Sequence, residues 1–188
     1  VSPHYSRSRL IKLIDREILN ASLGENSYIK LKMNSLSDFK MIDKLYEASN
    51  AGVKIMLQIR GICSLVPGVK GMSENISAIS ILDNYLEHSR IFIFCNNNDP
   101  DVYISSADFM TRNLDGRVEV TCPIYDTDIK NELIDIFDIG WKGNVKARIH
   151  SEKLDNKYKI RQSSPIFRAQ HQMYNYYRDR LQVTTENL

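Results

Sequence analysis

One segment, residues 28–59, restricts the fold more than any other part of the sequence. Residues 28–33 alternate apolar and basic side chains, which is typical of a strand with one buried face. Asp38 can cap a helix that continues to about Ser49, and an apolar run follows at residues 53–59. A strand, a helix and a strand within about 30 residues predict a βαβ unit with parallel strands and a right-handed crossover. We therefore expect an α/β fold.

The rest of the chain adds helices and antiparallel strands to this unit. An amphipathic stripe at residues 8–21 predicts an opening helix. Residues 90–94 and 102–105 flank a turn rich in Asn and Pro, a pattern that predicts a hairpin. Three more elements are expected: a strand at residues 117–121, a helix at residues 126–139 that ends at Gly140, and a closing helix at residues 168–181. Residues 1–188 are thus expected to form a single domain with helices packed on a mixed sheet.

The cysteines and the apolar runs bear on the compartment. Cys63, Cys95 and Cys122 are odd in number, lie far apart and lack C-x-x-C spacing, so they predict neither a disulfide framework nor a zinc site. No apolar run approaches the roughly 18 to 20 residues that cross a bilayer, and the N-terminus has no signal-peptide core. We expect a soluble piece of a longer protein from a reducing cytoplasm, with peripheral membrane association left open.

Positive charge is concentrated toward the C-terminus. The net charge of the chain is only +2, but residues 141–180 contain ten Lys or Arg against three Asp or Glu, a local charge of +7. Such a run is either a solvated face of a terminal helix or a surface for a polyanion. The sequence leaves both interpretations open.

The densest polar cluster in an apolar context is Glu87-His88-Ser89-Arg90, at the entrance to an expected strand. Residues at i and i+2 of an extended segment project to the same side, so His88 and Arg90 can face one bound phosphate. A histidine exchanges protons near neutral pH and can act as proton donor or nucleophile. The alternative is a purely structural role.

A second cluster, residues 105–113, follows the expected strand at residues 102–105. Ser105, Ser106 and Arg112 are the members best suited to donate hydrogen bonds to phosphate oxygens. The competing interpretation is a capped turn that its own side chains stabilise.

Two further residues in or next to expected strands have side chains that could bind phosphate or take part in catalysis. Arg60 ends the apolar run at residues 53–59, where a guanidinium offers planar, bidentate donors to a phosphate, or else forms an exposed salt bridge. Glu119 interrupts apolar neighbours, and it either orients His88 as a carboxylate partner or faces solvent. The sequence has no Walker-type or G-x-G-x-x-G loop, so a nucleotide phosphate must be held by side chains and strand-end loops.

Four segments of the chain are long and specific: SNAGVKIMLQIRGICSLVPGVKG (49–71), ISILDNYLEHSRIFIF (79–94), VYISSADFMTRNLDGRVEV (102–120) and NVKAR (144–148). Together they resemble bacterial polyphosphate kinase, and the likeness runs from about Tyr5 to near Tyr177. The resemblance implies a phospholipase-D-like fold, in a family with two such domains that each donate a histidine to one site. An N-terminal helical domain and a head domain precede them, and this chain is similar to the second of the two.

The resemblance also implies roles for individual residues. His88 corresponds to the second-domain histidine near the transferred phosphate and Arg60 to a contact with ATP phosphate, whereas the phosphorylated histidine belongs to the other domain. The superfamily's H-x-K signature is altered here to His88-Ser89-Arg90. The residues associated with Mg²⁺ and the aromatic residue that contacts adenine fall outside this chain, so we expect no metal ligand within it.

The implied reaction is reversible transfer of the ATP terminal phosphate to inorganic polyphosphate, with ADP released, through that phosphohistidine. In this scheme His88 acts as general acid or base, Glu119 fixes its tautomer, and phosphates are bound by Arg60, His88, Arg90, Ser105, Ser106 and Arg112. The expected partners are ATP, polyphosphate, the upstream domains and further copies in a homo-oligomer, but not nucleic acid. Alternatives are a non-catalytic polyanion-binding module, or a phospholipase-D-like nuclease or lipid hydrolase.

Overall fold

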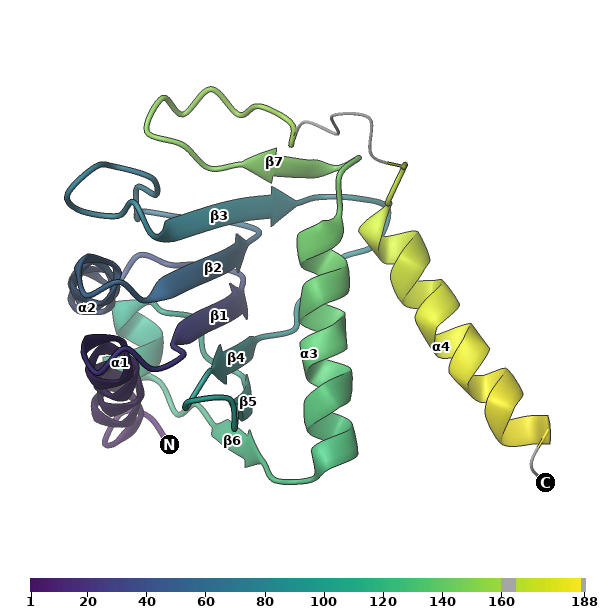
Figure 1. Cartoon of the computed structure of the whole chain (residues 1–188), viewed down its shortest axis with the longest axis horizontal. Coiled ribbons are helices and arrows are strands. Elements are labelled where there is room, and N and C mark those ends of the chain that lie inside the picture. Colours follow the sequence, from purple (N-terminus) through teal and green to yellow (C-terminus); the bar gives the residue numbers. More distant parts are fainter. Residues whose placement is uncertain (160–164, 187–188) are drawn as a thin grey trace.

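A computed structural model describes residues 1–159 and 165–186, with side chains as far as Leu181. Figure 1 shows the arrangement of its elements. The helices are α1 (Ser6–Ser22), α2 (Phe39–Asn50), α3 (Thr127–Lys142), α4 (Ala169–Glu186) and the short π-helix η1 (Arg112–Gly116). The strands are β1 (Tyr28–Met33), β2 (Lys54–Ile59), β3 (Ile76–Ile81), β4 (Ile91–Phe94), β5 (Asp101–Ser105), β6 (Thr121–Ile124) and β7 (Ala147–Ile149).

The seven strands form one mixed sheet in the order β6-β5-β4-β1-β2-β3-β7. β1, β2 and β3 are parallel, and their register pairs Leu31 with Leu57 and Leu57 with Ala78. The other neighbours are antiparallel, including the expected hairpin of β4 and β5. The sequence expectation of an α/β fold with a mixed sheet is confirmed.

The β1–α2–β2 unit forms as the sequence predicts. The side chain of Asp38 accepts a hydrogen bond from the backbone N–H of Met41 at 3.0 Å, which caps the first turn of α2. Arg7 and Thr111 also donate to this carboxylate. Burial alone would raise the pKa of Asp38, but these hydrogen bonds outweigh burial and lower the pKa to about 2. The cap therefore also ties α1 and the loop after β5 to α2.

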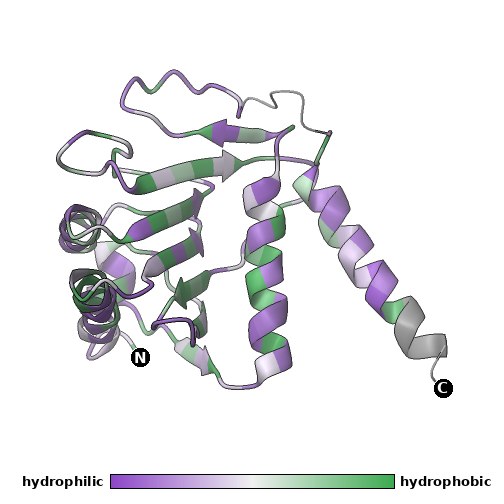
Figure 2. Ribbon diagram, in the orientation of Figure 1, coloured by the Kyte–Doolittle hydropathy of each residue, from purple (hydrophilic) through white to green (hydrophobic). Residues whose placement is uncertain are grey.

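Alternate residues of the central strands face two different layers. Ile29 and Leu31 of β1 belong to a continuous core under α1 and α2. Their neighbours Lys30 and Lys32 point the other way, toward α3 and α4, and Lys32 is only 8% exposed. The expectation of one buried face is wrong for β1, because α3 packs on the second face (Figure 1) and Glu87 covers Lys32. Figure 2 shows hydrophobic colouring concentrated in the strands and in α1–α3, with α4 mostly polar.

The strand expected at residues 117–121 is displaced. β6 begins only at Thr121 and contains Pro123, which an edge strand tolerates because its outer N–H positions need no partner. Glu119 lies before the strand, and its backbone carbonyl accepts from Ser2 N at 2.9 Å. The apolar–acidic–apolar pattern therefore marks a packed loop.

The helix α3 does not end at Gly140 but continues to Lys142. A Cβ atom at Gly140 would lie 2.4 Å from Oε1 of Gln58, whose Nε2 donates to the carbonyl of Phe137 at 2.7 Å. Glycine is needed at this position because helix and sheet approach closely there. The expected C-cap role is wrong.

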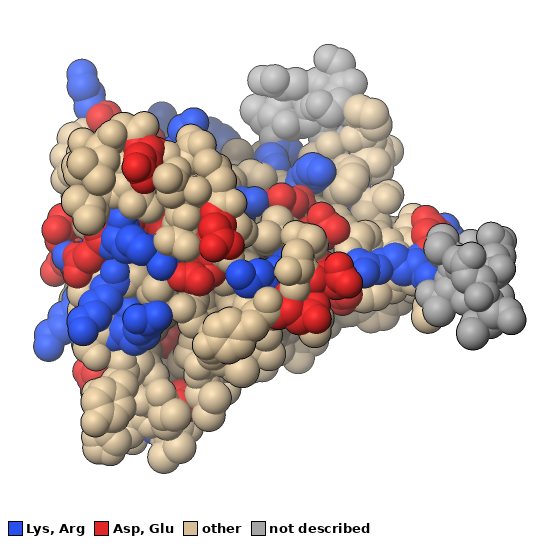
Figure 3. Space-filling model, turned by 60° about the horizontal axis from the view of Figure 1, so that its bottom comes forward, with Lys and Arg blue, Asp and Glu red and all other residues tan. Residues whose placement is uncertain are grey.

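Helix α4 extends the expected closing helix to Glu186 and projects from the body of the molecule (Figures 1 and 3). Its buried residues among those described are Ala169 and Gln170, both at its N-terminal end. Basic and acidic side chains are interspersed on the face drawn in Figure 3. No helix in the described part of the chain combines the length and the apolar character needed to cross a membrane.

Candidate functional site

The candidate site residues lie together at one edge of the sheet, where the parallel strands have their carboxyl ends. Asn34 directly follows β1 and Arg60 directly follows β2, so both lie at the carboxyl ends of parallel strands. β4 is antiparallel to β1, and residues 82–90 before it therefore reach the same edge. This is the edge at which α/β sheets commonly form binding sites.

Arg60 has a guanidinium whose charge is not neutralised. Its Nε and Nη2 donate to Oδ1 of Asn34 at 2.9 and 2.5 Å, and Nη2 lies 3.4 Å from Nδ1 of His88. Among the described residues, no carboxylate forms a salt bridge with Arg60. Because the amide of Asn34 is neutral, the positive charge of Arg60 is not compensated and can attract an incoming anion.

Arg90, in contrast, is paired. Its Nε and Nη2 donate to the two carboxylate oxygens of Asp108, each at 3.1 Å, and Nη1 donates to the backbone carbonyl of His88 at 3.1 Å. Asp108 in turn accepts from the backbone N–H of Asn34 at 2.8 Å. Arg60, Asn34, Asp108, Arg90 and His88 thus form a closed ring of contacts, which fixes His88 relative to Arg60.

The serines of the second cluster act mainly within their own turn. Ser105 Oγ accepts from the backbone N–H of Ala107 and lies 2.8 Å from Thr121 Oγ1. Ser106 Oγ accepts from Val120 N and donates to Glu119 in a very short bond. These contacts match the capped-turn interpretation, although Ser105 also lines a cavity beside His88. Arg112 is exposed at the start of η1, and among the described residues no side-chain hydrogen bond or ion pair joins it to the ring of contacts.

Glu119 is not the partner of His88 in the structure. One carboxylate oxygen accepts from Ser106 and the other from Asn113 Nδ2 at 2.6 Å, in a buried site. Across the described residues, no hydrogen bond or ion pair joins Glu119 to His88. The expectation that Glu119 orients His88 is therefore corrected, and the side chain that faces Nδ1 of His88 is Arg60.

Sequence reasoning did not single out Asn34 or Lys32. Asn34 could have been found from its place directly after β1, which matches that of Arg60 after β2. Lys32 Nζ contacts Glu87 Oε2 at 2.5 Å, and this pair joins β1 to the loop that carries His88. Local pattern gave no signal for that pair, because its members are far apart in the sequence.

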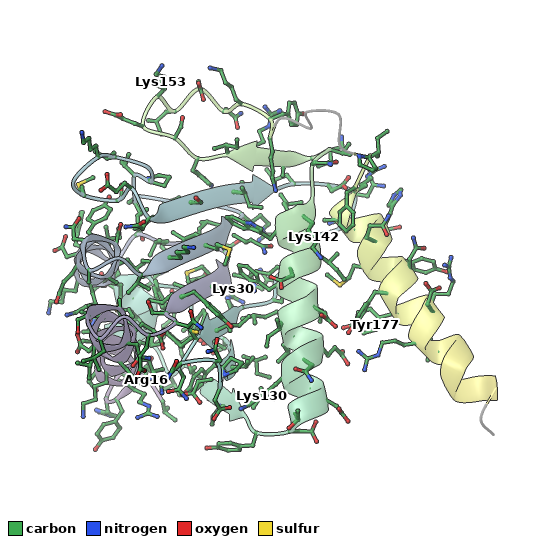
Figure 4. All side chains as sticks on the ribbon, in the orientation of Figure 1. Arg16, Lys30, Lys130, Lys142, Lys153 and Tyr177 are labelled. Atoms are coloured by element: carbon green, nitrogen blue, oxygen red, sulfur yellow. The ribbon has the colours of Figure 1, made fainter. Side chains whose placement is uncertain are left out.

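A cavity of about 620 Å³ opens beside His88, between the sheet, α3 and α4. Its apolar wall includes Ile104, Ile136 and Met173, and its polar end includes His88 and Arg90. Tyr177 points from α4 toward α3 (Figure 4), where its hydroxyl donates to Glu132 at 2.9 Å. Burial and this carboxylate raise the pKa of Tyr177 to about 12, so the phenol keeps its proton.

Part of the basic charge in residues 141–180 is used inside the protein. Arg168 pairs with Asp83 and Arg180 with Glu132, two acidic residues outside the stretch, whereas the partner of Lys157, Asp155, is already counted in the charge of +7. Arg161 lies outside the described residues. The charge excess of this stretch is thus smaller at the surface than the sequence count suggests.

Comparisons with known proteins agree with this arrangement. The family described as "Polyphosphate kinase C-terminal domain 2" matches residues 1–170. A polyphosphate kinase of Vibrio vulnificus is 51% identical over 176 residues, which are 94% of this chain and 25% of that protein. The chain therefore spans about a quarter of the length of the curated relatives that it matches.

Solved structures show the same fold. The crystal structure of polyphosphate kinase from Porphyromonas gingivalis matches with a TM-score of 0.93 and 43% identity, over 96% of this chain and 28% of that one. Nuc from Salmonella typhimurium, a phospholipase D family member, matches with a TM-score of 0.51 and 14% identity, over 72% of this chain and 89% of that one. The second likeness shows the phospholipase-D-like fold alone. On the match of residues 1–170 and the identity to the Vibrio protein, the chain belongs to the polyphosphate kinase family, in its C-terminal domain 2.

Proposed function

We propose that this chain is the second phospholipase-D-like domain of an enzyme that transfers the terminal phosphate of ATP reversibly to inorganic polyphosphate. The observation that carries the proposal is the pair of Arg60 and His88, in which an unneutralised guanidinium lies 3.4 Å from an imidazole nitrogen. Phosphoryl transfer needs chiefly positioning and stabilisation of charge, and both groups provide these at one edge of the sheet.

The proposed transfer takes two displacements. A histidine nitrogen on a domain outside this chain attacks the γ-phosphorus of ATP, the bond to the bridging oxygen breaks, and ADP leaves. A terminal oxygen of polyphosphate then attacks the same phosphorus, the P–N bond breaks, and the histidine is regenerated with a polyphosphate longer by one unit. Two displacements avoid bringing two polyanions together in a single step.

Within this scheme Arg60 binds phosphate oxygens and also sets the tautomer of His88. A guanidinium can only donate, so Nδ1 of His88 is the acceptor in this contact, and a neutral imidazole carries its proton on Nε2. That N–H is suited to donate a hydrogen bond to the bridging oxygen as negative charge develops on the departing ADP, and it keeps its proton in both directions of the reaction. Arg60 therefore has the orienting role that Glu119 was expected to have.

The residues of this site do not fit Mg²⁺. A hard cation takes oxygen ligands, whereas the site centres on a guanidinium and an imidazole, and its carboxylates Asp108 and Glu87 are paired with Arg90 and Lys32. In the described part of the chain, no group of three or more His, Cys, Asp or Glu could hold a metal ion. We place the magnesium ions of the proposed reaction in domains outside this chain.

The test uses a chimera in which this chain replaces the matching quarter of the Vibrio vulnificus relative. ATP consumption and polyphosphate formation are measured for the chimera, for the chain alone, and for the chimera with His88→Ala. We expect activity in the chimera only, and a loss on the order of 100-fold or more in the variant. His4→Ala is the matched control, because His4 is exposed and, among the described residues, no hydrogen bond or ion pair joins it to Arg60 or His88. Unchanged turnover in His88→Ala would rule out the proposed role of His88.

The chain alone also tests the polyanion-binding alternative. If that alternative holds, the isolated chain binds polyphosphate with a steep dependence on salt and without preference for ATP. Binding that instead depends on Arg60 and favours ATP supports the catalytic proposal.

A further inference from the structure

The loop at residues 82–90 carries His88 but has no regular secondary structure. Such a segment holds a reactive side chain in place only if other elements tether it. Arg90, the last residue of the loop, provides one tether, because its guanidinium is bonded to Asp108 and its Nη1 donates to the carbonyl of His88 at 3.1 Å. The remaining tethers come from β1 and from the beginning of α4.

Gln170 makes the central tether. Its Oε1 accepts from the backbone N–H of Tyr85 at 2.9 Å, and its Nε2 donates to the backbone carbonyl of Tyr85 at 2.8 Å. The same Nε2 donates to Glu87 Oε1 at 3.1 Å. Gln170 is 8% exposed, so water cannot readily replace these hydrogen bonds.

Glu87, directly before His88, is held from two sides. Oε1 accepts from Gln170 and Oε2 contacts Lys32 Nζ at 2.5 Å. Burial alone would raise the pKa of Glu87, but Lys32 and Gln170 outweigh it and lower the pKa. The carboxylate is thus charged and fixed between β1 and α4.

Arg168, directly before α4, adds further contacts to the loop. Its Nε and Nη2 donate to the two oxygens of Asp83 at 2.9 and 2.5 Å, and Nη2 also donates to Asn84. Arg168 and the beginning of α4 therefore hold residues 83, 84, 85 and 87 of the loop.

From this geometry we infer that Gln170 is a positioning residue for His88, acting through Tyr85 and Glu87. The inference rests on the proposed function. The contacts require an amide, because the oxygen faces an N–H donor while the nitrogen faces two acceptors. A glutamate would place a second carboxylate against Glu87, and an alanine would leave buried groups unpaired.

The test compares Gln170→Ala and Gln170→Glu in the chimera described above. A misplaced His88 should lower kcat on the order of 10- to 100-fold. KM for ATP should change less than about threefold, since Arg60 directly follows β2 and does not belong to the loop. The matched controls are Gln172→Ala and Gln172→Glu, two positions along the same helix, which should keep kcat within about twofold.

A double variant distinguishes positioning from a general loss of structure. In Glu87→Gln combined with Gln170→Glu, the new amide can accept from Lys32 and donate to the new carboxylate. We expect this pair to recover at least threefold in kcat over Gln170→Glu alone, an energetic coupling that a double-mutant cycle measures.

The imidazole signals of the chain labelled with ¹⁵N-histidine give a second readout that turnover cannot. Those of His88 should shift in Gln170→Ala while those of His4 and His150 stay. Normal kcat in both Gln170 variants overturns the inference. The inference also fails if the His88 signals do not shift and kcat falls only in proportion to the loss of folded protein. An inactive parent chimera, or full activity in His88→Ala, instead overturns the proposed function.

Discussion

The two faces of the sheet use the same strands for different purposes. On the face under α1 and α2, Ile29, Leu31 and Leu57 are fully buried in a continuous apolar core. On the other face, Lys32 and Gln58 occupy the alternating positions and bond to a loop and to α3. The first face contributes the apolar core. The second face carries polar groups, and one of them, Lys32, contacts the loop that holds His88. Stability and chemistry should therefore respond to different substitutions within a single strand.

The largest expected effect is on the α1 and α2 face. Leu31→Ala should lower the free energy of unfolding by about 3 to 4 kcal/mol, because it leaves a cavity in the core. Lys30→Ala, one position away on the other face, removes a partly buried ion pair with Asp138 and contacts with the rings of Tyr28 and Phe137, and should cost about 1 to 2 kcal/mol. Urea unfolding of the purified chain measures both, and equal losses would break the comparison.

Arg60→Ala tests the opposite face and should change activity without changing stability. Turnover of the chimera should fall roughly 100-fold, equivalent to about 2.7 kcal/mol, because the unneutralised cation of the site is lost. The melting temperature should stay within about 2 °C, since within the described part of the chain the Arg60 side chain bonds only to Asn34 and His88. Arg60→Lys should restore only part of the rate, as an ammonium lacks the planar fork.

Arg9→Ala, on the exposed surface of α1, is the control for the loss of an arginine. A fall in stability for Arg60→Ala as large as its fall in rate would mean that Arg60 is a structural residue.

The ion pair of Asp38 sharpens the comparison through its pH dependence. The pKa of Asp38 falls from 3.8 to about 2 on folding, so its contribution is complete above about pH 4 to 5 and disappears as the pH falls through 2. Asp38→Asn keeps a capping side chain but loses the charge, and should cost on the order of 2 kcal/mol at pH 7. The difference between parent and variant should shrink as the pH is lowered from 5 to 2.5, as measured by urea unfolding. A constant difference would show that the charge on Asp38 is not the cause.

The smallest effect concerns the contact between α3 and the sheet. Gly140→Ala gains about 1 kcal/mol of helix propensity, but its Cβ would meet Gln58 at 2.4 Å, so we expect a net loss of about 1 kcal/mol. In a Gln58→Ala background the same substitution should stabilise the chain. Calorimetry of the four proteins in this cycle measures the coupling, and additive effects would argue against a clash.

The sequence predicts the β1–α2–β2 unit well because its signals are local. The Asp38 cap and the strand periods lie within the segment that they shape. Arg60 and His88 could be selected for the same reason, since Arg60 directly follows one short apolar run and His88 lies shortly before another.

Other features depend on contacts between distant segments, and local patterns could not reveal them. Glu119 has the alternation of a strand residue, but Ser106 and Asn113 take its carboxylate. Lys32 has the alternation of a solvent-facing residue, but a loop more than 50 positions later neutralises it. Nothing in the sequence around Gln170 indicates its role, since the role depends on hydrogen bonds to Tyr85 and Glu87, which are far away in the sequence.

The path of α3 has a consequence for how the protein is made. The helix joins β6 and β7, which are the opposite edges of the sheet, and so arrives after the six strands β1 to β6 have been synthesised (Figure 1). Until then Ile91, Ile93 and Val102 on that side have no cover, because Phe137 packs against them from α3. A ribosome-bound chain that stops before Thr127 should therefore expose apolar surface and recruit chaperones. A chain that extends past Lys142 should bury this surface and recruit fewer chaperones.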